Sequence, residues 1–173
     1  MDAKNQQIRE TIDKVKAGYE AGNRPVSKDA KRILITGCPL AGATEKLVNA
    51  IEESGGVVVV YENCIGIKPL EKLVDEDAEP YWAIADRYLT IGCSVMSPNG
   101  YRMELLSKLI REFEVDGVVE MVLQACHTYA IETEEVRRLM QKENMPFISV
   151  ETDYSQSDLA QLKTRMAAFI EML

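Results

Sequence analysis

Four short apolar segments, each followed by a longer segment of helical periodicity, restrict the fold of this chain more than any other feature. The apolar segments span residues 33–36, 57–61, 117–123 and 147–150. They are rich in β-branched residues, as strands covered on both faces of a parallel sheet usually are. Helical patterns are expected at residues 44–54, 79–89, 100–113, 132–143 and 157–173. This alternation predicts the α/β class: a doubly wound, parallel, four-stranded sheet of Rossmann or flavodoxin-like type, with strand order 2-1-3-4 and helices on both faces.

The segment before the first strand has a different pattern. Apolar side chains recur at helical spacing and predict an amphipathic helix over residues 4–21, its apolar members being Ile8, Ile12, Val15 and Tyr19. A turn-rich stretch follows. We therefore expect an N-terminal helix and linker over residues 1–30 and a single α/β domain over residues 31–173.

Charge and hydropathy narrow the class of partner. The formal net charge is −8, whereas a general nucleic-acid binder presents a basic face. No apolar run approaches the length of a membrane span, and the opening "MDAKNQQIRE" lacks the apolar core of a signal peptide. The expectation is a cytoplasmic protein that binds neither nucleic acid nor a membrane.

The four cysteines have an unusual distribution. Three of them, Cys38, Cys64 and Cys126, follow the first three predicted strands within three residues, and Cys93 precedes the helix expected at residue 100. Because loops after parallel strands gather at the carboxyl edge of a sheet, these thiols are predicted to meet there and to share a metal or cluster. The alternative is that each packs as a small buried hydrophobe. Their polar or glycine-containing loops weaken that alternative.

The stretch "ITGCPLAGATEKL" (35–47) raises a competing possibility, a phosphate-binding loop. It lacks both the GxGxxG pattern and the lysine of a GxxxxGK loop. Gly37 and Gly42 are better explained as shaping a tight turn between strand and helix, which directs the Cys38 sulfur and nearby amides to the sheet edge. The cysteines have no CxxC spacing, which disfavours a zinc ribbon, and wide spacing suits an iron–sulfur cluster lying across several loops.

Several longer motifs resemble a known family. "RILITGCP", "GGVVVVYENCIGIK", "IADRYLTIGCSVMSPNGYR", "DGVVEMVLQACHTYAIE" and "ETDYSQSDLAQLKTRMAAFIEML" are similar to the C-terminal domain of the 2-hydroxyacyl-CoA dehydratase and benzoyl-CoA reductase family. The four-cysteine set is closest to the branch of double-cubane cluster proteins. The resemblance implies that Cys38, Cys64, Cys93 and Cys126 bind iron, in a 4Fe-4S or double-cubane 8Fe-9S cluster. Cys126 matches the best-defined ligand position, and Cys38 is the branch-specific addition.

The resemblance also implies partners. Family members carry two α/β domains with the cluster in the cleft between them, and a separate ATP-hydrolysing activator supplies electrons. This chain corresponds to the C-terminal half, so a missing N-terminal domain or partner subunit is expected to complete the site. We expect the half alone to be inactive, partly loaded at most, and to self-associate as a homo-oligomer through an uncovered apolar patch. The alternatives are an apo, non-catalytic module or a flavodoxin-like flavin or nucleotide binder.

Residues beside Cys126 are candidates for catalysis. Gln124, His127 and Tyr129 could donate protons or orient a small substrate, although His127 could instead satisfy a loop carbonyl. Trp82, in the helical segment at 79–89, is expected to contribute to the core.

Overall fold

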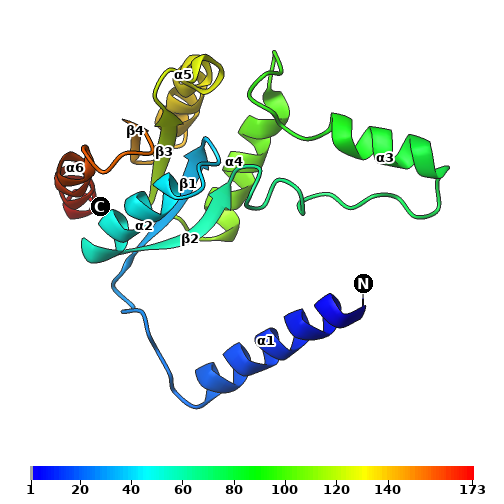
Figure 1. Cartoon of the computed structure of the whole chain (residues 1–173), viewed down its shortest axis with the longest axis horizontal. Helices are drawn as coiled ribbons and strands as arrows, with labels where there is room; N and C mark the ends of the chain where they lie inside the picture. The colour runs from blue at the N-terminus through cyan, green and yellow to red at the C-terminus, as the bar shows by residue number, and fades with distance from the viewer. Residues whose placement is uncertain (1) are drawn as a thin grey trace. The chain divides into compact units, whose positions relative to one another are not determined.

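A parallel sheet of four strands forms the centre of the domain in this computed structural model, which describes residues 2–173 (Figure 1). The strand order is β2-β1-β3-β4, as predicted. The strands have the bounds β1 Lys31–Gly37, β2 Gly56–Glu62, β3 Gly117–Leu123 and β4 Phe147–Thr152. All three pairings are parallel; Ile33 pairs with Gly117 and Val118 with Phe147. The predicted α/β class and doubly wound topology are confirmed.

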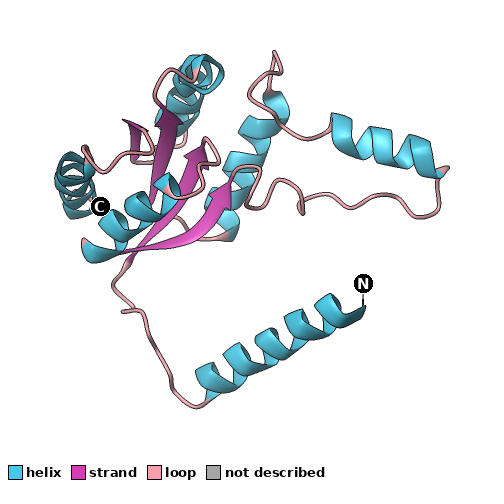
Figure 2. Ribbon diagram, viewed as in Figure 1, coloured by secondary structure: helices cyan, strands magenta, loops and turns pink. Residues whose placement is uncertain are grey.

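Helices cover both faces of the sheet (Figure 2). The helices of this unit are α2 Ala43–Glu53, α3 Pro80–Leu89, α4 Gly100–Glu112, α5 His127–Lys142 and α6 Leu159–Glu171. On one face, α2 and α6 bury Leu47, Ile51 and Met166 against Ile33 and Ile35. On the other face, α4 and α5 bury their apolar side chains against Leu34 and Val118. Successive strand residues point to opposite faces, so a strand that is apolar throughout serves both cores.

Two expectations about helices were wrong. The helix predicted at 132–143 begins at His127, so Cys126 is its N-cap residue rather than part of a long loop. The first turn is fixed by a hydrogen bond from Ala130 N–H to the Cys126 carbonyl (3.0 Å) and by the buried Tyr129. Trp82 does not join the core: it is 69% exposed on α3, which buries only Ala83 and Arg87. Arg87 donates to the carbonyls of Lys68 and Pro69, both at 3.0 Å.

The chain divides into two compact units, residues 1–30 and residues 31–173. The first unit contains helix α1, Asp2–Glu20, as its pattern predicted. Its apolar stripe is exposed, comprising Ile8, Ile12, Val15 and Tyr19. Within residues 2–173, none of the helices combines the length and apolarity that crossing a membrane would require.

Gly37 ends β1 in a conformation that only glycine adopts comfortably. Its φ is +101°, and a Cβ at this position would lie 2.2 Å from the Met121 carbonyl oxygen of β3. This close approach lets the next residue, Cys38, donate its N–H to the same carbonyl at 2.7 Å. A glycine therefore brings the first cysteine directly beside β3.

Candidate functional site

The carboxyl edge of the sheet carries a pair of adjacent thiols. Cys38 follows β1, Cys126 follows β3, and these two strands are neighbours. Cys38 is only 3% exposed, and its sulfur accepts the Leu123 N–H at 3.4 Å. The Cys126 side chain packs against the apolar cluster that contains Cys38, and it lies close enough to act on the pKa of the Cys38 thiol. The topology has thus brought together two of the four predicted ligands.

The two thiols of this pair have opposite acid–base behaviour. Burial, with a smaller contribution from the neighbouring Cys126, raises the pKa of Cys38 to about 11, although the hydrogen bond from the Leu123 N–H opposes this rise. Burial also acts to raise the pKa of Cys126, but the nearby Thr128 hydroxyl, the N–H groups of the first helical turn and the Cys38 side chain outweigh it and lower the net pKa. Thr128 Oγ1 lies 3.5 Å from the Cys126 sulfur. Cys38 therefore favours the neutral thiol, whereas Cys126 is the more thiolate-prone of the two.

The N-terminus of α5 adds to this preference. Cys126 is the N-cap residue, although its side chain makes no capping hydrogen bond to the backbone. The first turn of a helix presents free N–H groups and a partial positive charge, which favour an anion. Thiolate character is enhanced at such positions. Cys126 is therefore better suited to bind a cation than its sequence position suggested.

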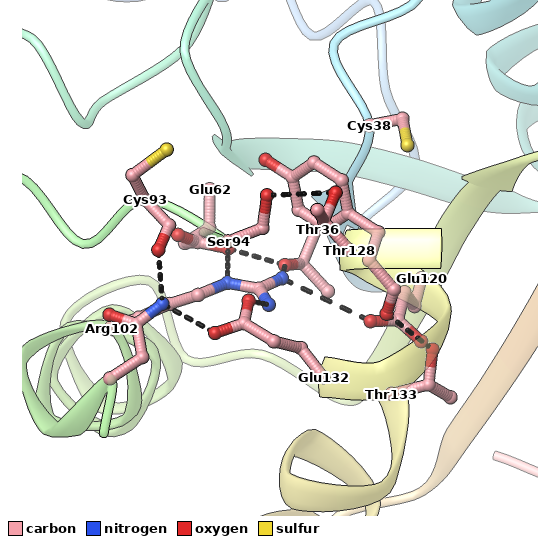
Figure 3. A network of polar contacts seen from close by, with 12 residues as sticks. Thr36, Cys38, Glu62, Cys93, Ser94, Arg102, Glu120, Thr128, Glu132 and Thr133 are labelled. Atoms are coloured by element: carbon pink, nitrogen blue, oxygen red, sulfur yellow. Dashed lines mark hydrogen bonds and ion pairs between the residues drawn. The ribbon is translucent and has the colours of Figure 1, made fainter. Parts of the chain in front are cut away.

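The other two cysteines are placed differently. Cys64, after β2, is exposed, and Cys93 is half-buried in the loop before α4. The Cys93 carbonyl accepts a hydrogen bond from Asn99 Nδ2 at 2.8 Å, and in Figure 3 its sulfur lies well apart from that of Cys38. Over residues 2–173, no three His, Cys, Asp or Glu side chains are grouped so that they could hold a metal ion.

The catalytic candidates beside Cys126 differ in accessibility. His127 and Gln124 are exposed, and the Gln124 N–H bonds the Thr152 carbonyl at 2.9 Å. Tyr129 is 7% exposed, and burial raises the pKa of its phenol far above the ordinary value. The phenol is therefore held protonated. Its ring lies 5.1 Å from the Arg102 guanidinium carbon and 6.0 Å from Lys68 Nζ, which favours cation–π attraction.

A buried ionic network lies next to the thiol-bearing edge (Figure 3). Its centre is Arg102 of α4, which is 0% exposed. The guanidinium donates to Thr36 Oγ1 at 2.8 Å and to Glu62 at 3.2 Å, and it pairs with Glu132 of α5. Glu62 also pairs with Lys68 at 2.9 Å. One arginine thus connects β1, β2, α4 and α5 around the site.

The network reaches the Cys93 loop through a single amide. Asn99 Nδ2 donates to Glu132 Oε1 at 2.5 Å as well as to the Cys93 carbonyl. Cys93 is preceded by Gly92, where a Cβ would lie 2.8 Å from the Arg102 Cβ. The Cys93 loop therefore contacts the buried ionic network twice, through the Asn99 amide and through the close packing of Gly92 on Arg102.

Sequence reasoning missed this network, although two signals were present. Glu120 interrupts the apolar run of β3 and is 0% exposed, and a charge within a strand covered on both faces requires a partner. Arg102 lies on the same helical stripe as Leu106 and Leu109, which are buried. A charged residue on an apolar stripe is a sign of a buried ion pair.

Glu120 gives the network a pH dependence. Its carboxylate lies 3.9 Å from Arg102. Burial raises its pKa above the usual carboxyl value, while the Thr133 and Ser149 hydroxyls and Arg102 oppose this rise. With Glu120 protonated, two cations (Arg102 and Lys68) face two carboxylates (Glu62 and Glu132), so the buried charges balance.

We expect Glu120→Gln to change how stability depends on pH. A carboxyl with a raised folded-state pKa contributes stability that is fully present below its unfolded pKa and is lost as pH rises through the folded value. The amide cannot ionise, so the variant should gain stability relative to the unmodified chain between about pH 5 and about pH 8. Urea unfolding at both values measures this. Glu112→Gln, at an exposed position, is the control, and an equal gain there would contradict the interpretation.

Comparison with known proteins identifies the family. The family model described as 2-hydroxyglutaryl-CoA dehydratase, D-component, matches residues 1–173, the whole chain. The chain belongs to this family. This confirms the dehydratase resemblance that the sequence motifs indicated.

Two curated relatives of the D-component family are similar over most of this chain. YjiM of Escherichia coli strain K12, provisionally named a dehydratase subunit, is 55% identical over 161 residues, covering 92% of this chain and 42% of YjiM. The (R)-phenyllactyl-CoA dehydratase beta subunit of Clostridium sporogenes is 22% identical over 176 residues, covering 100% of this chain and 45% of that subunit. The chain therefore spans less than half the length of these relatives.

Proposed function

We propose that this chain supplies the cysteine-bearing half of an iron–sulfur centre in a dehydratase of 2-hydroxyacyl-CoA thioesters or a related low-potential reductase. The observation that carries the proposal is the Cys38–Cys126 pair at the carboxyl edge of the sheet, with Cys126 at a helix N-terminus. Two thiols from neighbouring strands, one of them inclined to be a thiolate, are the ligand chemistry that such clusters use. Family membership supports the reaction class.

The cysteines of this chain are the ligand type that such a cluster requires, but only two of them, Cys38 and Cys126, lie close together. Cys38 and Cys126 would be its first ligands, and the Leu123 N–H that bonds the Cys38 sulfur is a contact of the type that tunes a cluster's potential. Cys64 and Cys93 are the further candidates, on loops that would have to approach the pair. The cluster would be 4Fe-4S or the double-cubane 8Fe-9S type.

The proposed division of labour follows from the chain's own side chains. A bound cluster would supply low-potential electron transfer. Cys38 and Cys126 would hold it, and the Arg102 network would fix α5 and the Cys93 loop beneath it. The remaining ligands and the second wall of the cleft would come from an additional domain or a partner subunit. A separate ATP-hydrolysing activator would deliver electrons in the cytoplasm.

A second candidate is an apo module that binds no metal unaided. It is favoured by the finding that, among the described residues, fewer than three potential ligands converge. In that case the chain would serve as a folded scaffold, and metal binding would require the rest of the assembly.

Anaerobic purification followed by spectroscopy tests the proposal. The protein is prepared as these 173 residues and as the full product of its gene, reconstituted with iron and sulfide, and analysed for both elements. Broad absorption near about 400 nm with bound iron supports the cluster, whereas resolved bands near about 370 and 450 nm would indicate flavin instead. Iron in the full product alone supports the shared site. A colourless, iron-free full product would overturn the proposal.

A further inference from the structure

A cavity of about 630 Å³ lies beside the thiol-bearing edge. It is formed by the loop at 94–100, the start of α4 and one side of α5. Its apolar lining comprises Val95, Met96, Pro98, Met103 and Ile131. The volume is within the range of sites that bind small molecules, which are mostly apolar with a few polar groups.

The polar side chains that line the cavity are three hydroxyls, one amide and two carboxylates, from Ser94, Ser97, Thr128, Asn99, Glu132 and Glu135. Asn99 lines it, and its amide oxygen is buried without a hydrogen-bond partner. Glu132 and Glu135 are the charged lining residues, and the described lining includes no lysine, arginine or histidine. A ligand group that enters would therefore meet carboxylates and an unused acceptor, but no cation at the cavity wall.

The cavity is next to the proposed cluster ligands. Thr128, which lines it, has its Oγ1 3.4 Å from Ser94 Oγ and 3.5 Å from the Cys126 sulfur. Figure 3 shows Ser94 and Thr128 side by side. Asn99 binds the carbonyl of Cys93. Only the Thr128 side chain would thus separate a small molecule in the cavity from the Cys126 sulfur at the thiol-bearing edge.

We propose that this cavity binds the neutral, mainly apolar end of the substrate, with a hydrogen-bond donor directed to Asn99, and rejects a carboxylate at that position. The inference rests on the proposed function and deepens it, because it assigns the substrate class: an acyl group with an uncharged side chain rather than a dicarboxylic one.

Charge is the basis of this selectivity. An anion in the cavity would give up water without gaining a cationic side chain as its partner, since Arg102 is fully buried behind Glu132 and already pairs with it. Glu135 is exposed and shares Arg138, at 3.2 Å, with Glu134. Like charges in a partly buried site disfavour binding, whereas an apolar group gains from burial against Met96, Met103 and Ile131.

Fragment binding observed by methyl NMR tests the proposal without any metal. The 173-residue chain, labelled at methionine and isoleucine methyl groups, is titrated with isovaleramide, glutaramide and glutarate. Glutaramide and glutarate have the same skeleton and differ in charge. Isovaleramide and glutaramide should shift the methyl signals of Met96, Met103 and Ile131 saturably. Glutarate should bind at least about tenfold more weakly.

A matched pair of variants separates site charge from net charge. Glu135→Lys places a cation in the cavity wall, so glutarate binding should rise to the level of glutaramide. Glu134→Lys makes the same charge change one residue away, also removes a partner of Arg138, and does not line the cavity. It should leave the glutarate affinity unchanged within about twofold.

Four results would overturn the proposal, three of them from fragment binding. Those three are no shift with either amide, glutarate affinity equal to that of glutaramide in the unmodified chain, or equal gains from both lysine variants. Methyl shifts that depend on protein concentration without any fragment would also overturn it and would mark the surface as a self-association face. Because no iron is present, failure here is distinguishable from failure of the cluster proposal.

Discussion

Arg102→Met is expected to destabilise the fold by about 3–5 kcal/mol, the range for breaking a buried ion pair by removing one partner. Methionine preserves much of the side-chain volume, so the loss arises mainly from charge. Glu62 and Glu132 would remain in the interior beside Glu120 with only Lys68 as a compensating cation. Because whole domains are stable by about 5–15 kcal/mol, this is a large fraction of the total. Urea or guanidinium unfolding, followed by circular dichroism, measures it.

Two further variants keep this prediction testable if Arg102→Met does not fold. The double variant Arg102→Met/Glu132→Gln also removes one of the carboxylates left without its partner, so it should recover a substantial part of the lost unfolding free energy. Arg138→Met removes an arginine that pairs on the exposed face of α5 and should cost no more than about 1 kcal/mol. A loss at Arg102 as small as that at Arg138 would mean that the network contributes little.

Cys126→Ser is expected to abolish most iron binding while leaving the fold intact. Serine is close to cysteine in size but is a poor ligand for iron, and it removes the thiolate that Thr128, the Tyr129 backbone and Cys38 favour. Because the side chain is half-buried at a helix cap, the unfolding free energy should change by no more than about 1 kcal/mol. Iron and sulfide per chain after anaerobic reconstitution measure the effect, with circular dichroism as the folding control.

Cys38→Ser tests whether the pair acts as a unit. The family resemblance implies that Cys38 is a branch-specific addition, but the structure places it next to Cys126, after the neighbouring strand. We expect its iron loss to approach that of Cys126→Ser and to exceed that of Cys64→Ser, since Cys64 is exposed. Full iron content in Cys126→Ser would remove that residue from the site and would leave the cluster proposal without its main support.

The strands and their order could be predicted because the signal was simple. Continuous β-branched runs such as "VVVV" in β2 are typical of strands in a parallel sheet packed between helices. The same topology predicted that Cys38 and Cys126 would approach each other, because loops after adjacent parallel strands share an edge. The same rule applied to Cys64, which follows β2, but it could not predict that this side chain is exposed. Cys93 follows no strand directly, and its loop has no periodic pattern from which the direction of its side chain could be predicted.

The start of α5 and the ion network were missed for a related reason. Residues His127 to Ile131 have no clear amphipathic pattern, and tertiary contacts of Tyr129 and Glu132 decide that the helix begins there. The hydrogen-bond partners of the Arg102 side chain lie between 30 and 66 residues away from it in the sequence. A sequence pattern identifies a charged residue on an apolar stripe, but it does not name the distant group that neutralises it.

The pairing of β1 with β3 determines when the site can come into existence. The bond from Leu123 N–H to the Cys38 sulfur spans 85 residues, and that from Arg102 to Thr36 spans 66. Contacts this distant close late in folding, because a long loop loses entropy before it gains any contact. During synthesis, Cys38 leaves the ribosome well before its partner Cys126 and remains exposed until β3 has joined β1. If the proposed cluster forms, metal delivery would therefore follow completion of the sheet, and until then Cys38 is a lone thiol open to oxidation.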